Sequence, residues 1–596
     1  MMKRWILVAA ALLVSTLSEA VPARPGTFVH VQPDGSVLTL RKVGDEWGHS
    51  VIDAATGRTL RLDADGWYRE LDETSAAVRR SAARARRSAV RRTRAARSEE
   101  HVAVGRKHFL VILVEFSDAS FTMDNPQEAF RSLLNDSGYS VNGGTGSARD
   151  FYYDNSHGCF EPVFDVYGPV SLNNAYSYYG GNDSAGNDLR AEQAVIDACR
   201  KLDEEVDFSQ YDLDGDGYVD MVFMYYAGYG EADHDDENTI WPHQWYIESG
   251  AGKSVTLDGV KLDSYACTNE LIGYGSREGT MCGIGTACHE FGHAMGLPDF
   301  YDTDYKVNDA CEGLYSYSTM CSGSYNNDGR TPPYFNMMER IMLGWKSESD
   351  FREFTASGYV TLPSIDENVA YRIPTEREGE FFILEARGSN GWDSALPGHG
   401  LLVYHADQSD RKVSIAYYDA SGKLNQIQVA ASELWNDWQQ YNAINENGSH
   451  PCFYLVPAPS QTSLSYSYEA RIPFPYGSVK SYTPVSWDGV SSPISLSAIT
   501  YASDQVRFLV TLPKEDVDYN LIANPGNGTY SAGDRFSFEL VESETRPVAS
   551  VEWYYDDEPA SSASVSLTAG VHTVEAHLTL TSGVKKIVTL EITVNQ

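Results

Sequence analysis

The stretch Cys288-His289-Glu290-Phe291-Gly292-His293-Ala294-Met295-Gly296-Leu297-Pro298-Asp299 decides how the rest of the chain is interpreted. On a helix, His289 and His293 lie one turn apart, so both imidazoles project from the same face. Two imidazoles at this spacing suit a divalent metal, and zinc is the usual occupant. Glu290 follows the first histidine directly, so it can reach a zinc-bound water and act as the general base without binding the metal.

A zinc site that does chemistry needs a third protein ligand and an open position. Gly296 favours the left-handed conformation that ends a helix, and Pro298 cannot prolong it, so the chain can turn and bring Asp299 back to the metal. Glu312 is the alternative ligand, but the Tyr/Ser-rich run after it is a poor helix former. The Gly-x-x-Asp turn therefore favours Asp299. A chance H-E-x-x-H is disfavoured because these extra residues accompany the motif.

Length and charge bound the class of protein. A chain of 596 residues is too long for one hydrophobic core, so several domains are expected. Residues 99–596 carry 29 Lys/Arg against 73 Asp/Glu, a net charge of −44. This strongly negative charge of residues 99–596 argues against nucleic acid or an anionic membrane surface as a partner.

The first twenty residues resemble a secretory signal peptide. Lys3 and Arg4 precede an apolar run, and Ser18-Glu19-Ala20 forms a small-x-small cleavage site. The apolar run is too short to span a bilayer, and the sequence shows no transmembrane segment elsewhere. We therefore expect residues 1–20 to be removed and the protein to be secreted or extracellular, which is compatible with retention at the cell surface.

Residues 21–98 have the features of a propeptide. Residues 27–73 alternate apolar and polar positions between turns, which predicts a small β-rich unit. Ala76 to Arg97 contains nine arginines and no acidic residue, so it is typical of an exposed processing segment that an Arg-specific protease can cut. The propeptide contains no cysteine, which excludes a thiol that blocks the zinc; an aspartate in that role remains open.

The remaining sequence predicts three further domains. A buried strand at Phe109–Phe116 opens the catalytic domain at residues 99–346, with helices at Ser147–Asn155, Glu192–Leu202 and Pro332–Trp345. Short β-like runs with turns follow in residues 347–514. Residues 515–596 predict an Ig-like β-sandwich without a disulfide. The expected fold class is multidomain α+β.

A second metal site is predicted upstream of the zinc motif. Asp212, Asp214, Asp216 and Asp220 occupy positions 1, 3, 5 and 9 of a calcium-binding loop, and the Tyr218 carbonyl would supply position 7. Phe223 stands where a helix-loop-helix calcium site has glutamate, and a strand follows the loop. The alternative is a polar turn; the ligand spacing favours structural calcium.

Residues near the zinc motif complete the candidate site. Met320 lies in Tyr317-Ser318-Thr319-Met320, which resembles the turn that places a methionine beneath a zinc site, and Tyr325 is a candidate oxyanion donor. His243 is interpreted as a satisfied structural histidine. The eight cysteines include four around the motif, for which a structural disulfide is favoured over zinc ligation.

These features together resemble the immune inhibitor A group of secreted bacterial metallopeptidases, within the metzincin-like zinc proteases. The resemblance covers about residues 25–510 and rests on these stretches: Asp212 to Asp220, Ile240-Trp241-Pro242-His243, His289 to Asp302, Met320, Leu343-Gly344-Trp345, Ile383 to Arg387 and Gly398 to Leu402. It implies zinc bound by His289, His293 and Asp299, with Glu290 as general base and residues 21–98 as propeptide. Cys288 departs from the pattern and leaves redox effects on activity open.

The sequence therefore predicts a secreted zinc endopeptidase that is made as a zymogen and acts on proteins or peptides. Two alternatives belong to other classes. One is a secreted zinc hydrolase that cleaves a non-peptide amide. The other is an adhesin or binding protein that uses its β domains and carries an inactive zinc site, which the intact Glu290 and ligand set disfavour.

Overall fold

A computed structural model describes residues 21–45, 48–63, 65–71, 103–182, 187–234, 236–273, 275–303, 311–418, 424–459, 466–512, 519–524, 530–541, 547–556, 558–581 and 585–596. The predicted signal peptide and the arginine-rich segment lie outside these residues. The chain divides into two compact units, Met1–Thr511 and Leu512–Gln596. Among the described residues, no helix is long and apolar enough to cross a membrane. The fold is mixed α+β and rich in strands, as the sequence predicts.

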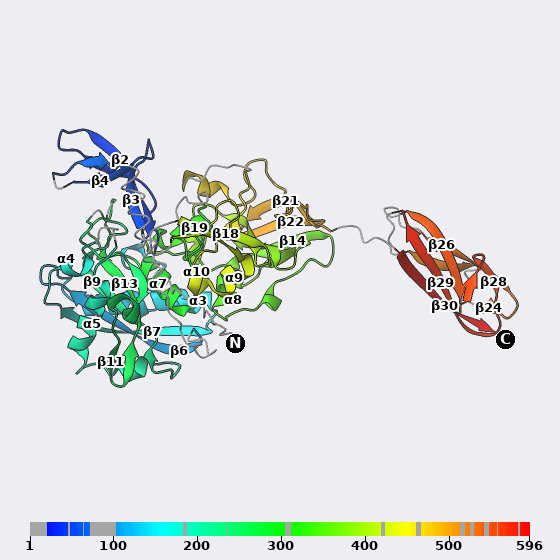
Figure 1. Cartoon of the computed structure of the whole chain (residues 1–596), viewed down its shortest axis with the longest axis horizontal. Coiled ribbons are helices and arrows are strands. Elements are labelled where there is room, and N and C mark those ends of the chain that lie inside the picture. The colour runs from blue at the N-terminus through cyan, green and yellow to red at the C-terminus, as the bar shows by residue number, and fades with distance from the viewer. Residues whose placement is uncertain are drawn as a thin grey trace, which may run out of the picture. The chain divides into compact units, whose positions relative to one another are not determined.

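The N-terminal region is a five-stranded antiparallel sheet in which the strands follow one another in sequence order (Figure 1). Its alternating apolar positions bury Leu40, Ile52 and Tyr68, while Val29 and Val31 remain exposed. The strands are β1 (Phe28–Val31), β2 (Val37–Asp45), β3 (Gly48–Asp53), β4 (Thr59–Leu62) and β5 (Tyr68–Glu70).

A five-stranded sheet built from residues between Gly105 and Leu271 has the order β10-β13-β9-β6-β7. All neighbours pair in parallel except β10, which is antiparallel to β13 at the edge. The sheet is hidden on both faces, which explains the continuous apolar run of its middle strand. The strands are β6 (Gly105–Glu115), β7 (Phe160–Ser171), β9 (Val222–Tyr229), β10 (His243–Tyr246) and β13 (Ser264–Leu271).

Alternate residues of β6 point into two different cores. Phe109, Val111 and Leu113 join the core that also contains helices α2 (Pro126–Asn135), α3 (Ala148–Asn155) and α7 (Gly285–Met295). Leu110, Ile112 and Val114 join the opposite core with α4 (Tyr176–Gly180), α5 (Ala191–Leu202) and α6 (Ile247–Ala251). Helix α7, which carries the histidine motif, is thereby fixed on one face of the sheet: Phe291 packs edge-on against Phe109 with ring centroids 4.8 Å apart.

Two predicted helices agree with the structure and one does not. Helix α3 begins after Ser147, whose side chain forms a capping box with Asp150, and α5 matches the expected segment within one residue. The helix expected from Pro332 to Trp345 is wrong in its extent: α8 spans only Met337–Met342. Asn336 and Glu339 cap its first turn reciprocally, so the helix starts there and the prolines precede it as extended chain.

Residues 347–511 form three small sheets. Two have the strand orders β15-β16-β17-β20 and β14-β22-β21, and the third is the hairpin β18-β19. Their buried residues, such as Ile383 and Leu402, belong to the same core as the zinc-motif helix. The elements are β14 (Gly358–Pro363), β15 (Tyr371–Pro374), β16 (Glu380–Arg387), β17 (Gly400–Asp407), β18 (Lys412–Tyr418), β19 (Leu424–Ala430), β20 (Phe453–Leu455), β21 (Ser495–Ala502), β22 (Gln505–Thr511), α9 (Ala431–Asn436) and α10 (Trp438–Tyr441).

Arg387, which forms a buried ion pair, connects this region to the loops that contain Tyr317 and Tyr334. Arg387 donates two hydrogen bonds of 2.7 Å to Asp393, and both side chains are fully buried. The same guanidinium donates to the carbonyls of Tyr317 (3.1 Å) and Tyr334 (2.8 Å), which flank the predicted methionine turn. The charge of Arg387 is therefore neutralised while its remaining donors hold these two loops.

The C-terminal unit consists of two sheets that share one core, in the orders β23-β25-β28 and β24-β30-β29-β26-β27. Its assignment as Ig-like remains a prediction. The strands are β23 (Asn520–Asn524), β24 (Tyr530–Ser531), β25 (Arg535–Val541), β26 (Val548–Tyr555), β27 (Glu558–Ala560), β28 (Ser564–Ser566), β29 (Gly570–Leu580) and β30 (Lys585–Asn595).

Replacing Asp393 with alanine should lower the free energy of unfolding by about 3–5 kcal/mol, because it leaves the buried guanidinium of Arg387 without its counter-ion. Urea unfolding of the full chain, followed by tryptophan fluorescence, measures this loss. Glu128→Ala is the control, since it removes a carboxylate whose pair with Arg131 is about 60% exposed and should change stability by less than about 1 kcal/mol. Equal effects of the two substitutions would contradict the structural role given to the Arg387–Asp393 pair.

Candidate active site

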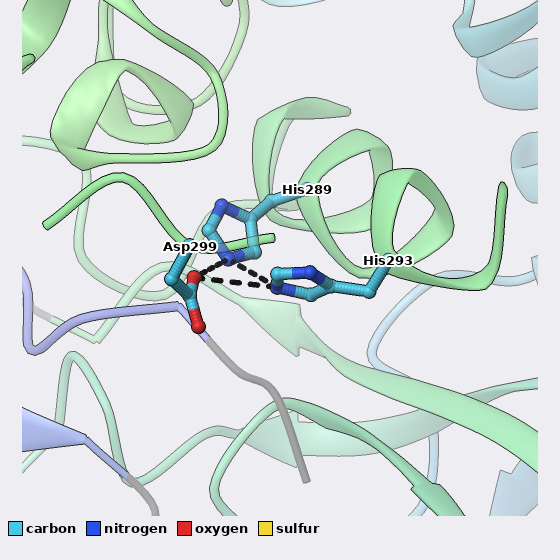
Figure 2. Close-up of side chains that lie close together, drawn as sticks. All are labelled: His289, His293 and Asp299. Carbon is cyan, nitrogen blue, oxygen red and sulfur yellow. Dashed lines mark hydrogen bonds and ion pairs between the residues drawn. The ribbon is translucent and has the colours of Figure 1, made fainter. Parts of the chain in front are cut away.

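The three predicted ligands come together at the C-terminal end of α7 (Figure 2). His289 and His293 lie on one face of the helix. Gly296 ends it in the left-handed conformation (φ 113°), and its N–H donates to the His293 carbonyl at 3.0 Å. The chain then turns back and presents Asp299 to both imidazoles. Glu312, the alternative ligand, is not a member of this group.

The donor atoms of the three side chains are close together and shielded from water. The two Nε2 atoms lie 2.9 Å apart. Asp299 Oδ1 lies 3.2 Å from His289 Nε2 and 3.4 Å from His293 Nε2. The exposed fraction of each of the three residues is 4% or less. Two ligands about 2 Å from a tetrahedral zinc would be about 3.3 Å apart, so these separations fit one ion.

The protonation of both imidazoles follows from their outer partners. His289 Nδ1 lies 2.7 Å from the Thr319 carbonyl, and His293 Nδ1 lies 2.8 Å from the Leu297 carbonyl. A carbonyl only accepts, so each Nδ1 must carry the proton and each neutral ring has a bare Nε2. Burial and the neighbouring His293 lower the pKa of His289, which favours this neutral form.

Three electron pairs thus converge on one buried point. Burial alone would raise the pKa of Asp299, but His293 and His289 lower it below its ordinary value and keep the carboxylate ionised. Asp299 Oδ1 is buried without a hydrogen-bond donor of good geometry. Two lone pairs and a carboxylate oxygen at these distances repel one another unless a cation lies between them. The donor set therefore fits a divalent metal, and its nitrogen and oxygen atoms suit zinc.

Met320 packs directly beneath the helix that carries the histidines. A Cβ on Gly292 would lie 2.7 Å from the Met320 sulfur, so the glycine in His289-Glu290-Phe291-Gly292-His293 is required by this contact. The turn itself is held by Ser318, whose hydroxyl accepts the Met320 N–H (3.0 Å) and donates to Glu339 (2.5 Å). Burial raises the pKa of Glu339 to about 7.

The general-base candidate, Glu290, is fully buried and contacts the N-terminal segment. The Val21 N–H donates to Glu290 Oε1 at 2.9 Å across 269 residues of sequence. Trp241 Nε1 donates to the Val21 carbonyl at 3.1 Å, and the Tyr325 hydroxyl donates to the Pro22 carbonyl at 2.7 Å. In Figure 2 this segment is the violet-blue tube that ends beside Asp299. Tyr325 therefore already bonds a peptide carbonyl beside the site.

The rest of the N-terminal sheet continues this contact. The Arg24 N–H donates to the Ala232 carbonyl at 3.1 Å, and the Arg24 side chain forms an ion pair with Asp328. Lys42 Nζ donates to the carbonyls of Glu231 (2.5 Å) and His234 (2.9 Å). His49 pairs with the buried Glu231 carboxylate at 2.7 Å and stacks on Trp241. The sheet thus attaches to residues 231–241 through both main-chain and charged contacts.

The predicted calcium loop is only partly assembled as a ligand set. Carboxylate oxygens of Asp212, Asp214 and Asp216 lie within 4.8 Å of one another. Asp220 is not a member of this group; its Oδ2 accepts the Leu213 N–H at 2.5 Å. Burial, with the other three carboxylates adding to it, raises the pKa of Asp220 to about 7. Tyr218 begins β8 (Tyr218–Val219), which pairs with β12 (Val260–Leu262); β11 (Val255–Leu257) completes that sheet.

The expected disulfide near the metal motif is wrong: all eight cysteines are free thiols. Cys288 is a fully buried residue of α7, and burial raises the pKa of its thiol well above the ordinary value. Cys282 donates to the Asn269 carbonyl at 2.8 Å. His243, as expected, is a satisfied core residue between the Trp241 carbonyl (2.6 Å) and the Tyr265 hydroxyl (2.8 Å), and burial lowers its pKa to about 4.

Sequence reasoning missed two residues at this site. Asn442 donates from Nδ2 to Asp299 Oδ2 at 2.7 Å, although it lies 143 residues away. Val21 contacts Glu290 through its main chain, which no side-chain pattern reveals. Neither residue belongs to a motif.

Sequence comparisons with known proteins find similarity to metallopeptidases. Residues 97–340 match the sequence model of "Immune inhibitor A peptidase M6, catalytic domain". Immune inhibitor A of Bacillus thuringiensis subsp. alesti is 25% identical over 276 residues, which is 39% of each chain. The pre-pro-metalloprotease PrtV of Vibrio cholerae serotype O1 is 27% identical over 241 residues, 35% of this chain and 25% of that protein. The crystal structure of OgpA from Akkermansia muciniphila aligns with 84% of this chain and 96% of that one at 9% identity, with a TM-score of only 0.22.

The histidine-aspartate cluster lies within residues 97–340, the segment that is similar to a metallopeptidase catalytic domain. More particularly, the family that this part of the chain matches is the immune inhibitor A peptidases, which confirms the resemblance drawn from the sequence. The aligned regions span less than half the length of the curated relatives.

Proposed function

We propose that the protein is a zinc-dependent endopeptidase, exported and made as a zymogen, whose substrates are proteins or peptides. The observation that carries the proposal is the convergence of two bare Nε2 atoms and Asp299 Oδ1 beside Glu290. The peptidase family of the surrounding segment supports the reaction class. We further propose a metzincin-like arrangement for this domain, because Met320 lies directly beneath the ligand helix.

His289, His293 and Asp299 would hold the zinc. When bound, zinc acts as a Lewis acid that polarises a carbonyl and lowers the pKa of bound water to near neutral. Glu290 then takes a proton from the attacking water and delivers it to the leaving amine, a contribution of roughly 10²–10⁴-fold. The Tyr325 hydroxyl donates to the oxygen of the scissile carbonyl, a role supported by its present bond to the Pro22 carbonyl.

The N-terminal segment would keep the enzyme latent by occupying the place of a substrate. The Val21 N–H donates to a carboxylate oxygen of Glu290, the group that has to accept a proton in catalysis. The Pro22 carbonyl accepts the hydrogen bond that the Tyr325 hydroxyl would donate to a substrate. If the predicted cleavage follows Ala20, the Val21 nitrogen becomes the α-amino group, whose charge strengthens the bond to Glu290. This assigns latency to the main chain at Val21 rather than to an aspartate. The printed name of the Vibrio relative, a pre-pro-metalloprotease, agrees with export and latency.

The same segment favours peptides over a non-peptide amide as substrates. Val21 to Arg24 offer the surrounding residues a series of main-chain groups: the Val21 and Pro22 carbonyls accept bonds, and the Arg24 N–H donates one. A site that already binds consecutive peptide units in this way is suited to a polypeptide. The negative charge of residues 99–596 is compatible with export followed by retention at the cell surface.

We also propose structural calcium at the loop of Asp212, Asp214 and Asp216. Their carboxylate oxygens lie within 4.8 Å of one another, and Asp212 Oδ1 is buried without a hydrogen-bond partner. Such a group binds a hard cation through oxygen ligands. Asp220 and the Tyr218 carbonyl, which the sequence pattern includes, would join the ion from the end of the loop.

Glu290→Gln should retain zinc but lose roughly 10²–10⁴-fold in peptide turnover, because the amide keeps the shape of the side chain and cannot accept the proton. Zinc content by mass spectrometry and cleavage of a quenched fluorescent peptide measure the two effects separately. Turnover near the wild-type rate would show that Glu290 is not the general base.

Limited trypsin treatment should activate the purified protein by cutting between Ala76 and Arg97, after which a zinc chelator should abolish casein hydrolysis. Arg24→Ala should raise the activity of the uncut protein, because it removes the ion pair with Asp328 that holds the N-terminal segment. Arg58→Ala is the matched control, since its pair with Glu70 is 64% and 58% exposed and remote from Glu290. Full activity before any cut would contradict latency.

Calcium should raise the melting temperature of the protein and bind at one tight site. Asp214→Asn should weaken that binding by roughly tenfold or more, because the ligand charge falls. Asp203→Asn removes the same charge from an exposed position outside the loop and serves as the control. Isothermal titration that gives equal calcium affinity for both variants would place the ion elsewhere.

A further inference from the structure

We infer that Asn442 is a positioning residue of the metal site, supplied by the β-rich region rather than by the catalytic segment. The inference rests on the proposed zinc site of His289, His293 and Asp299. Asn442 lies about one hundred residues beyond the end of the family match at residue 340. It belongs to the β-rich region of residues 347–511. It stands at the end of α10 and is 1% exposed.

Asn442 recognises Asp299 through both halves of its amide. Nδ2 donates to Asp299 Oδ2 at 2.7 Å, and Oδ1 accepts the Asp299 N–H at 3.0 Å. One side chain thus fixes the main chain and the carboxylate of the same ligand. Asparagine suits this task because it carries a donor and an acceptor on a short stem.

This pair of bonds decides which oxygen of Asp299 faces the metal. Oδ2 is occupied by the asparagine donor, so Oδ1 is directed at the two imidazoles, 3.2 and 3.4 Å away. A ligating carboxylate whose second oxygen is hydrogen-bonded keeps a fixed orientation, and such outer partners raise metal affinity. Without Asn442, the carboxylate of Asp299 would be free to rotate away from His289 and His293.

The loop that carries Asn442 is itself anchored to the ligand segment. The Thr303 hydroxyl donates to the Asn442 carbonyl at 2.7 Å, and Asn445 Nδ2 donates to the Phe300 carbonyl at 2.8 Å. Asn442 adopts the left-handed conformation (φ 39°, ψ 49°), and its main-chain N–H donates to the Trp438 carbonyl at 2.6 Å. Asparagine tolerates this backbone better than most residues, which adds a second reason for its presence.

Two substitutions separate the role in positioning from the role in capping α10. Asn442→Gly keeps the left-handed backbone at no steric cost and removes both amide bonds. Asn442→Asp keeps the acceptor for the Asp299 N–H but places an oxygen against Asp299 Oδ2 in place of the donor. Asn447→Ala is the control, because Asn447 lies in the same loop and donates to the Ser414 carbonyl, away from the metal.

The experiment measures zinc affinity of the full chain by competition with a chromophoric chelator, together with the melting temperature of the metal-free protein. Asn442→Gly should bind zinc roughly 10–100-fold more weakly, and Asn442→Asp at least as weakly, while Asn447→Ala binds like the wild type. The cobalt-substituted protein should show altered visible bands in the Asn442 variants only. Metal-free melting temperatures should be similar for Asn442→Gly and Asn447→Ala.

Wild-type zinc affinity in both Asn442 variants would overturn the inference. A second result would also overturn it: weaker zinc binding together with a lower melting temperature of the metal-free protein and an unchanged cobalt spectrum. That combination is expected if Asn442 only stabilises the fold. A wild-type protein that binds no zinc would instead overturn the proposed zinc site itself.

Discussion

The hydrogen bonds from two imidazole Nδ1 atoms to the carbonyls of Thr319 and Leu297 determine the chemistry of the site. They place the proton of each ring on its outer side and leave both Nε2 atoms bare toward Asp299. Every other feature near the site serves this arrangement. Met320 packs against the glycine between the histidines, and Ser318 holds the turn that presents the Thr319 carbonyl. The buried Arg387 then binds the loop from behind through the Tyr317 carbonyl.

The contacts of the N-terminal sheet divide into two kinds with different chemistry. Near Glu290 they are made by the main chain of Val21 and Pro22, which any sequence could supply. Farther out they are made by the side chains of Arg24, Lys42 and His49, which meet carboxylates or carbonyls of the catalytic segment. In the proposed zymogen, the main-chain contacts would block the chemistry, and the charged contacts would provide the strength of attachment. Removing the sheet would return the acidic side chains of that surface to solvent.

How much the sequence predicts depends on how local the cause is. The ligand cluster follows from helical spacing and a glycine stop within eleven residues, so His289, His293 and Asp299 are found together as expected. The fold class, the resemblance to the immune inhibitor A family and two helices also follow from local patterns. Local reasoning fails for the helix at Pro332–Trp345, because the Asn336–Glu339 capping box fixes a later start. The disulfide expectation fails because all four cysteines around the motif are free thiols, and two of them, Cys288 and Cys321, are buried in the core.

Contacts between distant segments leave no trace in a single sequence. Asn442 is an ordinary asparagine until the fold places it 2.7 Å from Asp299, and Val21 contacts Glu290 with a main-chain group that every residue but proline has. Both depend on loop closure across 143 and 269 residues, respectively. Periodicity and motif spacing describe one element at a time, so they cannot report such pairs.

The position of Asn442 has a consequence for the order in which the molecule matures. A polypeptide is made from its N-terminus, so the histidine helix exists before the loop that steadies the third ligand. The ligand set is therefore finished only after the β-rich region has folded against it. At the proposed zinc site, a truncated or stalled chain would hold the metal loosely, and tight metal binding would indicate that the first 511 residues have reached their final packing.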